Sequence, residues 1–347
     1  MTRLRAPAPP VVGASAAQLA AGTLYALAAG LMWGLVFVAP VLLPGYSPAL
    51  QSFGRYLAFG LVALPLAWLS RRALALLTRA DWIEALKLAA VGNIVYYLFL
   101  ASAIQRAGAP LPTMIIGTLP VVIAVAANLR DARRDGRLPW RALLPPWLLI
   151  GAGIALVHRV ESGAAGVPPG ASDLAGGALL ALGAVACWTW YPLRNADWLR
   201  AHPDRSPTTW ATAQGIATLP LAVLGSAGVW WFESVAEPSV SMLVDVGGWR
   251  LPLGPQPLRF VALMLAMGLL ASWLGTLCWN QASQRLPTAL VGQLIVFETL
   301  AALAYAYVLR AAWPAPATAL GIGLLVAGVL RAVRVRPVAV VAAAPPH

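Results

Sequence analysis

The sequence predicts an all-α integral membrane protein with ten transmembrane helices, arranged as two inverted five-helix repeats. Three observations lead to this fold class: the composition, the distribution of Lys and Arg, and an internal repeat. Of the 347 residues, 60% are hydrophobic and 10% are charged, and the mean hydropathy is +0.75. A soluble domain has about 25% charged residues. The composition therefore excludes water-soluble globular, disordered and fibrous proteins, and the predicted spans leave no room for a soluble catalytic domain.

Apolar stretches long enough to cross a bilayer recur along the whole chain. A proline-rich segment behind Arg3 and Arg5 precedes the first of them, which favours a short tail before a transmembrane helix over a cleaved signal peptide. The predicted spans are 20–43, 50–69, 84–102, 110–128, 143–158, 174–194, 208–232, 258–280, 288–309 and 313–333. The corresponding organisation is a cytoplasmic N-terminal tail (1–19), a first repeat (20–158), an outer linker (159–173), a second repeat (174–333) and a cytoplasmic C-terminal tail (334–347).

The basic residues are distributed unevenly over the loops that these spans define. With the N-terminus inside, 18 Lys and Arg fall on the inner side, five fall on the outer side, and Arg55 lies within a span. Cytoplasmic loops carry the excess of Lys and Arg in membrane proteins, so both termini are expected in the cytoplasm. The net charge of +12 is scattered between apolar spans. Nucleic-acid binding is therefore not expected, because it requires a basic patch on a soluble face.

Few residues of the chain are suited to metal or redox chemistry. Cys187 and Cys278 both fall inside apolar spans and are expected to pack as small hydrophobic residues. The three histidines lie at span edges or at the C-terminus, and no cofactor or metal is expected.

The two halves of the sequence resemble each other. Residues 103–106 (Ala-Ile-Gln-Arg) match residues 282–285 (Ala-Ser-Gln-Arg) at an offset of 179, and Trp33 matches Trp188 at an offset of 155. The Ser-Pro pair at 47–48 recurs at 206–207. Five helices per repeat is an odd number, so the second copy enters the membrane from the opposite side. Inverted repeats are a transporter architecture, with the binding site near the midplane between the halves.

Several of these motifs together resemble the EamA-type carriers of the drug/metabolite transporter superfamily, over about residues 22–333. The resemblance implies a ten-helix secondary carrier of small metabolites, often an exporter. Two positions depart from the family pattern: Thr299 stands where proline usually follows the glutamate, and Gln214 stands opposite Arg55. The motifs that carry the resemblance are Met32-Trp33-Gly34, Arg55 after Ser47-Pro48, residues 103–106, Leu119-Pro120-Val121 and Phe297-Glu298.

Two ionisable residues lie at membrane depth. Glu298 is near the middle of its span, where a charged side chain costs about 2.5–3.5 kcal/mol. It is expected either to couple transport to protons or to contact a substrate ammonium group; the alternative is a structural carboxyl bonded between helices. Arg55 either attracts a substrate carboxylate or, from a site near the outer interface, caps the carbonyls of a neighbouring helix.

Polar and aromatic residues at helical spacing supply the other candidates for substrate binding. They are Trp33, Asn93, Tyr96, Tyr97, Trp188, Trp273 and Gln293. A single aromatic side chain in such a position is more often a packing or interfacial residue than a ligand contact. Asn195 and Asn280 fall near the inner ends of their spans and are expected to be hydrated. The resemblance and the repeat symmetry together place the cavity between helices one, three, four, six, eight and nine.

These residues favour an alternating-access carrier in the cell inner membrane, with a small-molecule substrate and the lipid bilayer as partners. The aromatic residues and the single acidic group indicate amino acids or related amphiphiles, with export as the expected direction and protons as a coupling ion. The alternative is an integral membrane enzyme acting on lipid-linked substrates, which would need clustered Asp, Glu or His and a metal. A receptor or assembly subunit is a third class, for which the inverted repeat has no physical use.

Overall fold

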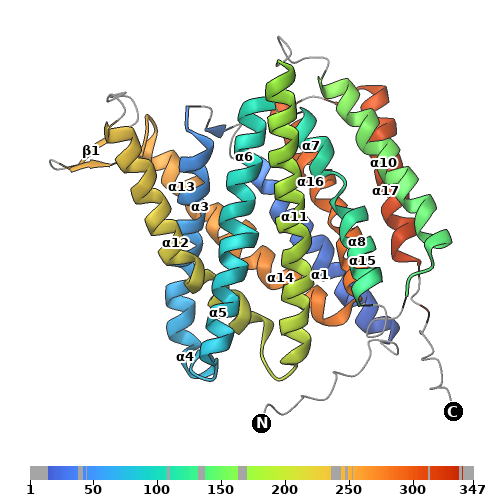
Figure 1. The fold of residues 1–347 in the computed structure, drawn as a ribbon, viewed down its shortest axis with the longest axis horizontal. Helices are drawn as coiled ribbons and strands as arrows, with labels where there is room; N and C mark the ends of the chain where they lie inside the picture. Colours follow the sequence, from blue (N-terminus) through green and yellow to red (C-terminus); the bar gives the residue numbers. More distant parts are fainter. Residues whose placement is uncertain are drawn as a thin grey trace.

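The structure is a computed structural model of the whole chain. It describes residues 15–37, 42–43, 45–107, 110–131, 137–162, 170–235, 244–246, 249–251, 253–311, 313–335 and 338. Nearly all of them belong to helices that run side by side in one bundle (Figure 1).

The helices of the first half are α1 (Ala16–Gly34), α3 (Pro48–Leu69), α4 (Arg71–Leu74), α5 (Arg79–Leu88), α6 (Tyr96–Ala107), α7 (Pro110–Ile116), α8 (Leu119–Arg130) and α10 (Trp140–Ser162). Those of the second half are α11 (Ala171–Ala201), α12 (Pro207–Val235), α13 (Pro257–Met267), α14 (Gly275–Arg285), α15 (Thr288–Leu294), α16 (Val296–Arg310) and α17 (Pro316–Val333). A 3₁₀ turn (Leu35–Phe37) extends α1, and π-helical segments join α5 to α6 (Ala89–Val95) and α13 to α14 (Gly268–Leu274).

The chain marks several helix starts with residues that satisfy free backbone N–H groups. The Ser47 side chain accepts a hydrogen bond from the Leu50 amide at 3.2 Å, and Pro48 occupies the first turn of α3. At the start of α5 the hydroxyl of Thr78 accepts from the Asp81 amide, while the Asp81 carboxylate accepts from the Thr78 amide at 2.8 Å. Such caps contribute about 1 kcal/mol each, and they fix where the helices begin.

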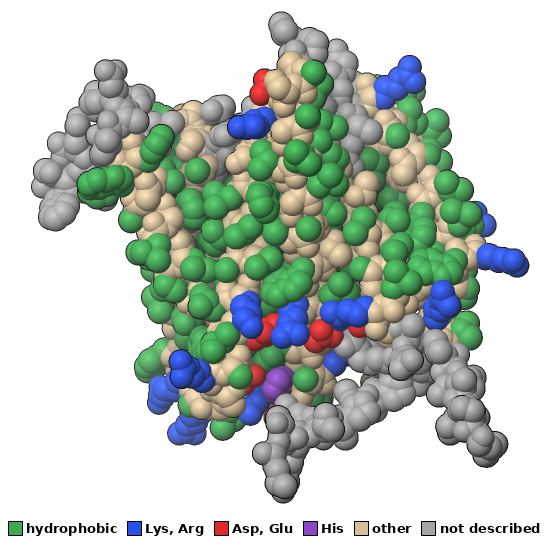
Figure 2. Space-filling view, in the orientation of Figure 1, with side chains coloured by type: hydrophobic (Ala, Val, Ile, Leu, Met, Phe, Trp, Pro, Cys, Tyr) green, Lys and Arg blue, Asp and Glu red, His purple; other side chains and the backbone are tan. Residues whose placement is uncertain are grey.

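Eight helices or unbroken helical runs of the described chain are long and apolar enough to cross a membrane. The predicted spans 110–128 and 313–333 correspond to shorter apolar helices, Leu119–Arg130 and Pro316–Ala332. Large apolar side chains cover the middle of the face in Figure 2, and Leu179 and Leu224 are each 70% exposed. Exposed apolar surface of this extent is favourable only against lipid, which supports a multi-pass membrane protein. The number of ten spans stays a prediction.

Two features differ from the sequence-based expectation. The first span was expected to reach residue 43, whereas α1 ends at Gly34, a 3₁₀ turn continues to Phe37, and residues 38–41 lie outside the described part of the chain. The described bundle is all-α as predicted, and the second difference is a short antiparallel hairpin after α12, in which β1 (Val244–Val246) pairs with β2 (Trp249–Leu251). This loop lies outside the predicted spans, where backbone groups can form a hairpin without a membrane constraint.

The two halves share irregularities as well as sequence. The π-helical segments Ala89–Val95 and Gly268–Leu274 are separated by 179 residues, the same offset that relates residues 103–106 to residues 282–285. The helix packing is also paired: α1 packs on α14 and α16, as α11 packs on α6 and α8. Helices α3 and α12, α8 and α15, and α10 and α17 pack on one another across the halves. Elements related by the sequence offset therefore make similar contacts.

One end of the bundle carries most of the described basic residues, and we call it the basic end. The start of α1 lies there, because Gly22 packs on Leu286, and so does Val338, which pairs through its backbone with Arg137. Figure 2 shows a row of Lys and Arg side chains along this lower edge of the visible face, with fewer at the upper edge. The described members are Arg71, Arg72, Arg79, Lys87, Arg130, Arg137, Arg141, Arg194, Arg200, Arg205, Arg285, Arg331 and Arg334.

Candidate functional site

A cavity of about 300 Å³ lies between the two halves of the bundle. Elements of both halves enclose it: α1, α3, the first π-helical segment and α6 from one half, and α11, the second π-helical segment, α14 and α16 from the other. The lining residues are Trp33, Val36, Gln51, Arg55, Tyr56, Phe59, Gly92, Asn93, Tyr96, Tyr97, Leu100, Ile104, Trp188, Tyr191, Ala271, Ser272, Thr276 and Glu298. The volume is in the range of pockets that bind small molecules, which begins at about 300 Å³.

Most of the residues that the sequence singled out meet in this cavity. Seven line it: Trp33, Arg55, Asn93, Tyr96, Tyr97, Trp188 and Glu298. The structure does not place Trp273 or Gln293 among the lining residues. The Trp273 indole N–H donates to the Thr212 hydroxyl at 3.2 Å, which turns this ring towards α12. Gln293 is fully buried in α15, where its side-chain amide donates to the Ala289 carbonyl at 3.4 Å.

The carboxylate of Glu298 is held at an interruption between two helices. The chain leaves α15 at Leu294 and enters α16 at Val296, so Glu298 lies in the first turn of α16. The free N–H groups and the dipole of a helix start favour a negative charge there. Among the described residues, the side chain of Glu298 has no hydrogen-bond or ion-pair partner, and it lines the cavity. An acidic group is therefore available to a cation, a hydrogen-bond donor or a proton inside the cavity.

Arg55 supplies a positive charge to the same cavity. Its Nε donates to the Ser272 hydroxyl at 2.9 Å, and its guanidinium carbon lies 5.1 Å from the ring centre of Tyr56. The hydrogen bond joins α3 of the first half to the π-helical segment of the second half. It uses one of the five N–H donors of the guanidinium, so the others remain for an acceptor in the cavity.

Aromatic rings form the wall nearest α1 and α11. The Trp33 and Trp188 rings meet edge to face, with their centres 5.1 Å apart, and Tyr96 lies 5.6 Å from Trp188. On its other side Trp188 contacts Tyr191 at 5.5 Å. Rings that hold one another in this way present a rigid apolar surface with few polar groups, which suits an apolar or aromatic substrate group.

The first π-helical segment brings backbone to the cavity surface. A side chain at Gly92 would collide with the Tyr191 ring, so only glycine allows this close approach. The neighbouring Asn93 donates from its side-chain amide to the Thr218 hydroxyl of α12 at 3.3 Å. Single-turn π-helical insertions in α-helices are frequent at functional sites, and both insertions here line the cavity.

A layer of buried hydrogen bonds closes the cavity towards the basic end. Asn195 accepts from the Trp210 indole at 2.9 Å and from the Gln214 amide at 3.2 Å, and it donates to Asn280 at 2.9 Å. Gln214 also accepts from the Tyr191 hydroxyl at 2.9 Å, which links the layer to the cavity wall. Asn195 and Asn280 are both fully buried. The expectation that these asparagines are hydrated is wrong, because protein partners replace the water.

Five lining residues with polar groups were not among the sequence-predicted site residues: Gln51, Tyr56, Tyr191, Ser272 and Thr276. Sequence signals existed for some of them. Gln51 lies one helical turn before Arg55, and Tyr191 and Thr276 lie one turn after Trp188 and Trp273. Ser272 gives no such signal, because its role is visible only through its bond to Arg55 across 217 residues.

Known proteins resemble this chain in sequence and in fold. The sequence profile of the EamA-like transporter family matches residues 20–131. Inner membrane protein YtfF of Escherichia coli (strain K12) is 52% identical over 317 residues, which cover 91% of this chain and 96% of that protein. A chain of known crystal structure superimposes with a TM-score of 0.67 over 90% of this chain and 96% of its own length, at 20% identity. At that identity the superposition is evidence of the fold alone.

The sequence resemblance is thus confirmed by the family match and by a relative that is similar over almost its whole length. The apolar helices agree with a transporter of the membrane rather than with a soluble protein. The chain belongs to the EamA-like transporter family, within the drug/metabolite transporter superfamily.

Proposed function

We propose that this protein is a secondary active carrier that exports small zwitterionic metabolites, amino acids foremost, by alternating access. The observation that carries the proposal is the presence of Arg55 and Glu298 in one aromatic-walled cavity between the halves. Arg55 would hold the carboxylate of an amino acid, and Glu298 would accept its ammonium group. The rings of Trp33 and Trp188 would receive the side chain. The carrier makes and breaks no covalent bond in this proposal, so it is not an enzyme.

Protons are the coupling ion that Glu298 would serve. The carboxylate lies in the cavity without a protein partner among the described residues, so it can take up a proton or a substrate ammonium group but not both. Because the proton and the substrate compete for the same carboxylate, the transport of the proton is linked to the transport of the substrate. Antiport of a proton against an amino acid is the resulting mode of export.

Alternating access would use two inverted five-helix repeats, 20–158 and 174–333, joined by the outer linker 159–173. The paired helix contacts and the equal spacing of the two π-helical segments support this arrangement. The four segments Leu119–Arg130, Pro316–Ala332, α7 and α15 are short, and each of α7–α8 and α15–α16 is an interrupted pair. Counting each pair as one crossing gives ten spans. Interrupted helices at the midplane are typical of carrier binding sites.

The membrane and the orientation complete the proposal. The 52% identical relative is named an inner membrane protein, and we place this chain in the same membrane. The basic end would face the cytoplasm, together with the tails 1–19 and 334–347, because Lys and Arg are retained on that side. Among described side chains the opposite end carries Arg106, Arg159 and Arg259.

Cysteine labelling tests the orientation. We expect Ala75→Cys, at the basic end, to react with a membrane-impermeant maleimide only in inverted vesicles, and Ala171→Cys, at the opposite end, to react in intact cells. Both positions are exposed. The background for both variants replaces Cys187 and Cys278 by Ala. Labelling of Ala75→Cys in intact cells would contradict the proposed topology.

Flux measurement tests the function itself. Purified protein in proteoliposomes is expected to exchange radiolabelled amino acids, with aromatic and large apolar ones fastest, and to respond to an imposed proton gradient. Amines without a carboxylate and carboxylates without an amine are expected to compete weakly, because each would meet only one of the two charges. If a complete amino-acid panel gives no flux above protein-free liposomes, the proposed substrate class is wrong.

The aromatic wall gives a prediction about selectivity. Trp33→Ala or Tyr97→Ala removes a large part of the cavity surface and should lower the affinity for aromatic amino acids more than that for alanine. A shift of about tenfold in relative KM corresponds to losing roughly 1–2 kcal/mol of apolar contact. Trp273→Ala is the matched control, because this ring does not line the cavity. If Trp273→Ala shifts selectivity as much as Trp33→Ala does, the wall does not select the substrate.

A further inference from the structure

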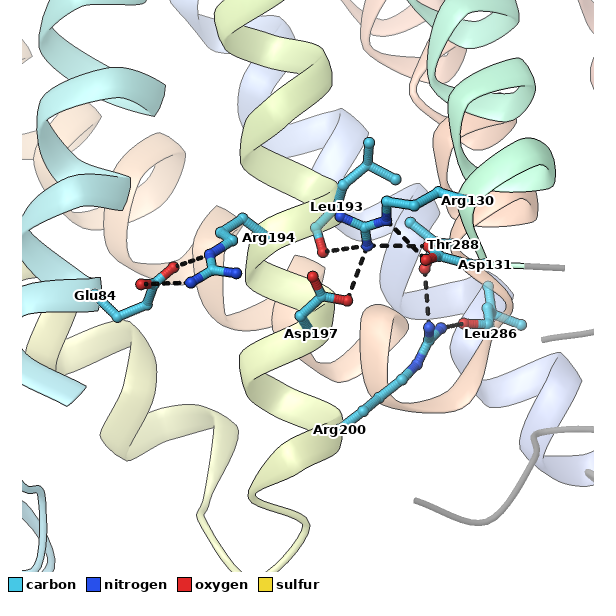
Figure 3. Close-up of polar contacts among 9 residues, drawn as sticks. All are labelled: Glu84, Arg130, Asp131, Leu193, Arg194, Asp197, Arg200, Leu286 and Thr288. Carbon is cyan, nitrogen blue, oxygen red and sulfur yellow. Dashed lines mark hydrogen bonds and ion pairs between the residues drawn. The ribbon is translucent and has the colours of Figure 1, made fainter. Parts of the chain in front are cut away.

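The basic-end part of α11 is bound to the first half by charged groups. Arg194 of α11 forms a two-pronged contact with Glu84 of α5, with Nε 2.6 Å from one carboxylate oxygen and Nη2 3.2 Å from the other (Figure 3). Three residues later, Asp197 accepts from Nη2 of Arg130 on α8 at 2.8 Å. The contacts place α11 between two helices of the first half, bonded to each.

A third contact lies one residue further along α11. The Trp198 indole donates to the Asp81 carboxylate of α5 at 2.8 Å, and His202 lies 3.5 Å from the same carboxylate. We call the three contacts Glu84–Arg194, Arg130–Asp197 and Asp81–Trp198 the α11 latch. The side chains of Asp81 and Glu84 are only 7% and 11% exposed. A carboxylate so poorly hydrated is costly without its partner, so the two contacts to α5 are stronger than pairs on an open surface. The Arg130–Asp197 pair is more hydrated, with side chains 41% and 30% exposed.

The opposite end has no comparable charged connection in the described part of the chain. Its connections between the halves include the Tyr46 hydroxyl, which donates to the Leu253 carbonyl at 2.7 Å and accepts from the Gln256 amide at 2.8 Å. The central cavity also extends towards this end, because Val36, Gln51 and Ile104 line it near the ends of their helices. The cavity is thus closed on one side by the layer around Asn195 and, beyond that layer, by the latch.

A second cavity lies directly against the latch. It has a volume of about 520 Å³ and lies between α5 and α11, where Asp81, Glu84, Arg194, Asp197, Trp198 and His202 contribute to its lining. Separation of Arg194 from Glu84 would leave charged side chains facing water in this space, which reduces the cost of breaking the pair. The space required for opening is therefore already present beside the latch.

We propose that the α11 latch is the cytoplasmic gate of the carrier, and that its three contacts must separate before the central cavity opens at the basic end. The gate rests on the proposed function, since only an alternating-access protein has to open this end. In the conformation described here the latch is closed. Weakening it should shift the population towards the form that is open at the basic end.

The test follows one reporter cysteine from both sides of the membrane. Thr276→Cys places a thiol on the cavity wall, in a background with Cys187→Ala and Cys278→Ala. Its labelling by an impermeant maleimide is measured in intact cells and in inverted vesicles. Arg194→Gln is expected to raise the rate in inverted vesicles by about three- to tenfold and to lower it in cells, as expected for losing one ion pair. Glu84→Gln should act in the same direction but less, because it leaves no buried carboxylate unpaired.

Two further variants make the result specific. Lys87→Gln is the matched control, because Lys87 also lies 3.9 Å from Glu84 but within the same helix; its rates should equal those of the parent. The exchanged pair Glu84→Arg/Arg194→Glu should return the rates towards the parent. If Arg194→Gln does not fold, Glu84→Gln and the exchanged pair carry the test.

Other results would overturn the gate. The first is that Glu84→Gln and Arg194→Gln label the reporter cysteine at the same rates as Lys87→Gln. The second is that these two variants unfold at a lower temperature while the ratio of labelling in inverted vesicles to labelling in cells is unchanged. The labelling needs no substrate. Changed labelling without amino-acid flux would therefore contradict the substrate class and keep the gate, whereas flux with unchanged labelling would contradict the gate and keep the function.

Discussion

Glu298→Gln is expected to insert and fold like the unmodified protein, and to lose both most of its amino-acid flux and its response to a proton gradient. Glutamine keeps the shape of the side chain but has no charge to offer a substrate ammonium group and cannot exchange a proton. A hydrogen bond to a charged group contributes about 1.5–3 kcal/mol, so the flux should fall roughly 10- to 100-fold at low substrate concentration. Fluxes in proteoliposomes at several imposed pH gradients measure both effects.

Asp173→Asn is the matched control for this change. It also replaces a carboxylate by an amide, but on the exposed first turn of α11, at the opposite end of the bundle. Its flux and its pH response should be those of the unmodified protein. Glu298→Gln with unchanged rate, affinity and pH response would mean that Glu298 is structural, and the proposed site would lose its centre.

Asn195→Ala is expected to produce the largest loss of stability. The change removes the partner of three buried groups at once: the Trp210 indole, the Gln214 amide and the Asn280 carbonyl. Each buried polar group left unsatisfied costs about 1–3 kcal/mol, and Asn195 and Asn280 are fully buried. The midpoint of heat unfolding of the purified protein in detergent should fall by several degrees, as measured by size-exclusion chromatography after heating.

Asn93→Ala is the control that shows whether the loss of stability in Asn195→Ala comes from burial or from the loss of any asparagine. Asn93 also donates to a side chain of α12, but it lines the cavity, where water can replace the lost bond. Its heat stability should change by much less than that of Asn195→Ala. Equal midpoints for the two variants would show that the layer around Asn195 does not hold the helices together.

Local sequence properties were sufficient for much of the architecture. Apolar length predicted where the spans lie, because a membrane segment satisfies its own backbone hydrogen bonds and needs few tertiary contacts for its definition. The offset of 179 that relates residues 103–106 to 282–285 recurs in the spacing of the π-helical segments. The predicted first span runs to residue 43, whereas α1 ends at Gly34 and a 3₁₀ turn follows to Phe37, and composition gives no sign of this change of helix type.

The candidate site was predicted in part, and its errors have a common cause. Glu298 and Arg55 stood out because a charge in a membrane span is costly wherever it points. Ordinary helical spacing would place Thr276 on the same face as Trp273, yet Thr276 lines the cavity and Trp273 faces α12. The π-helical segment ends between them, at Leu274, and its i→i+5 bonds change the rotation per residue. The directions of these two side chains therefore cannot be read from a period of 3.6.

By itself, the sequence determined the membrane class, the repeat, the family and the costly charges, because each of these depends on the identity of residues and on short-range order. Only the tertiary structure decided which polar groups meet: Arg55 with Ser272, Asn195 with Asn280, and Glu84 with Arg194, across separations of 217, 85 and 110 residues. Glu84 looks like an ordinary charge near a helix end until packing leaves its side chain only 11% exposed, while its partner Arg194 stays 46% exposed. The Glu84 carboxylate then depends on Arg194, because a poorly hydrated charge is stable only beside its partner.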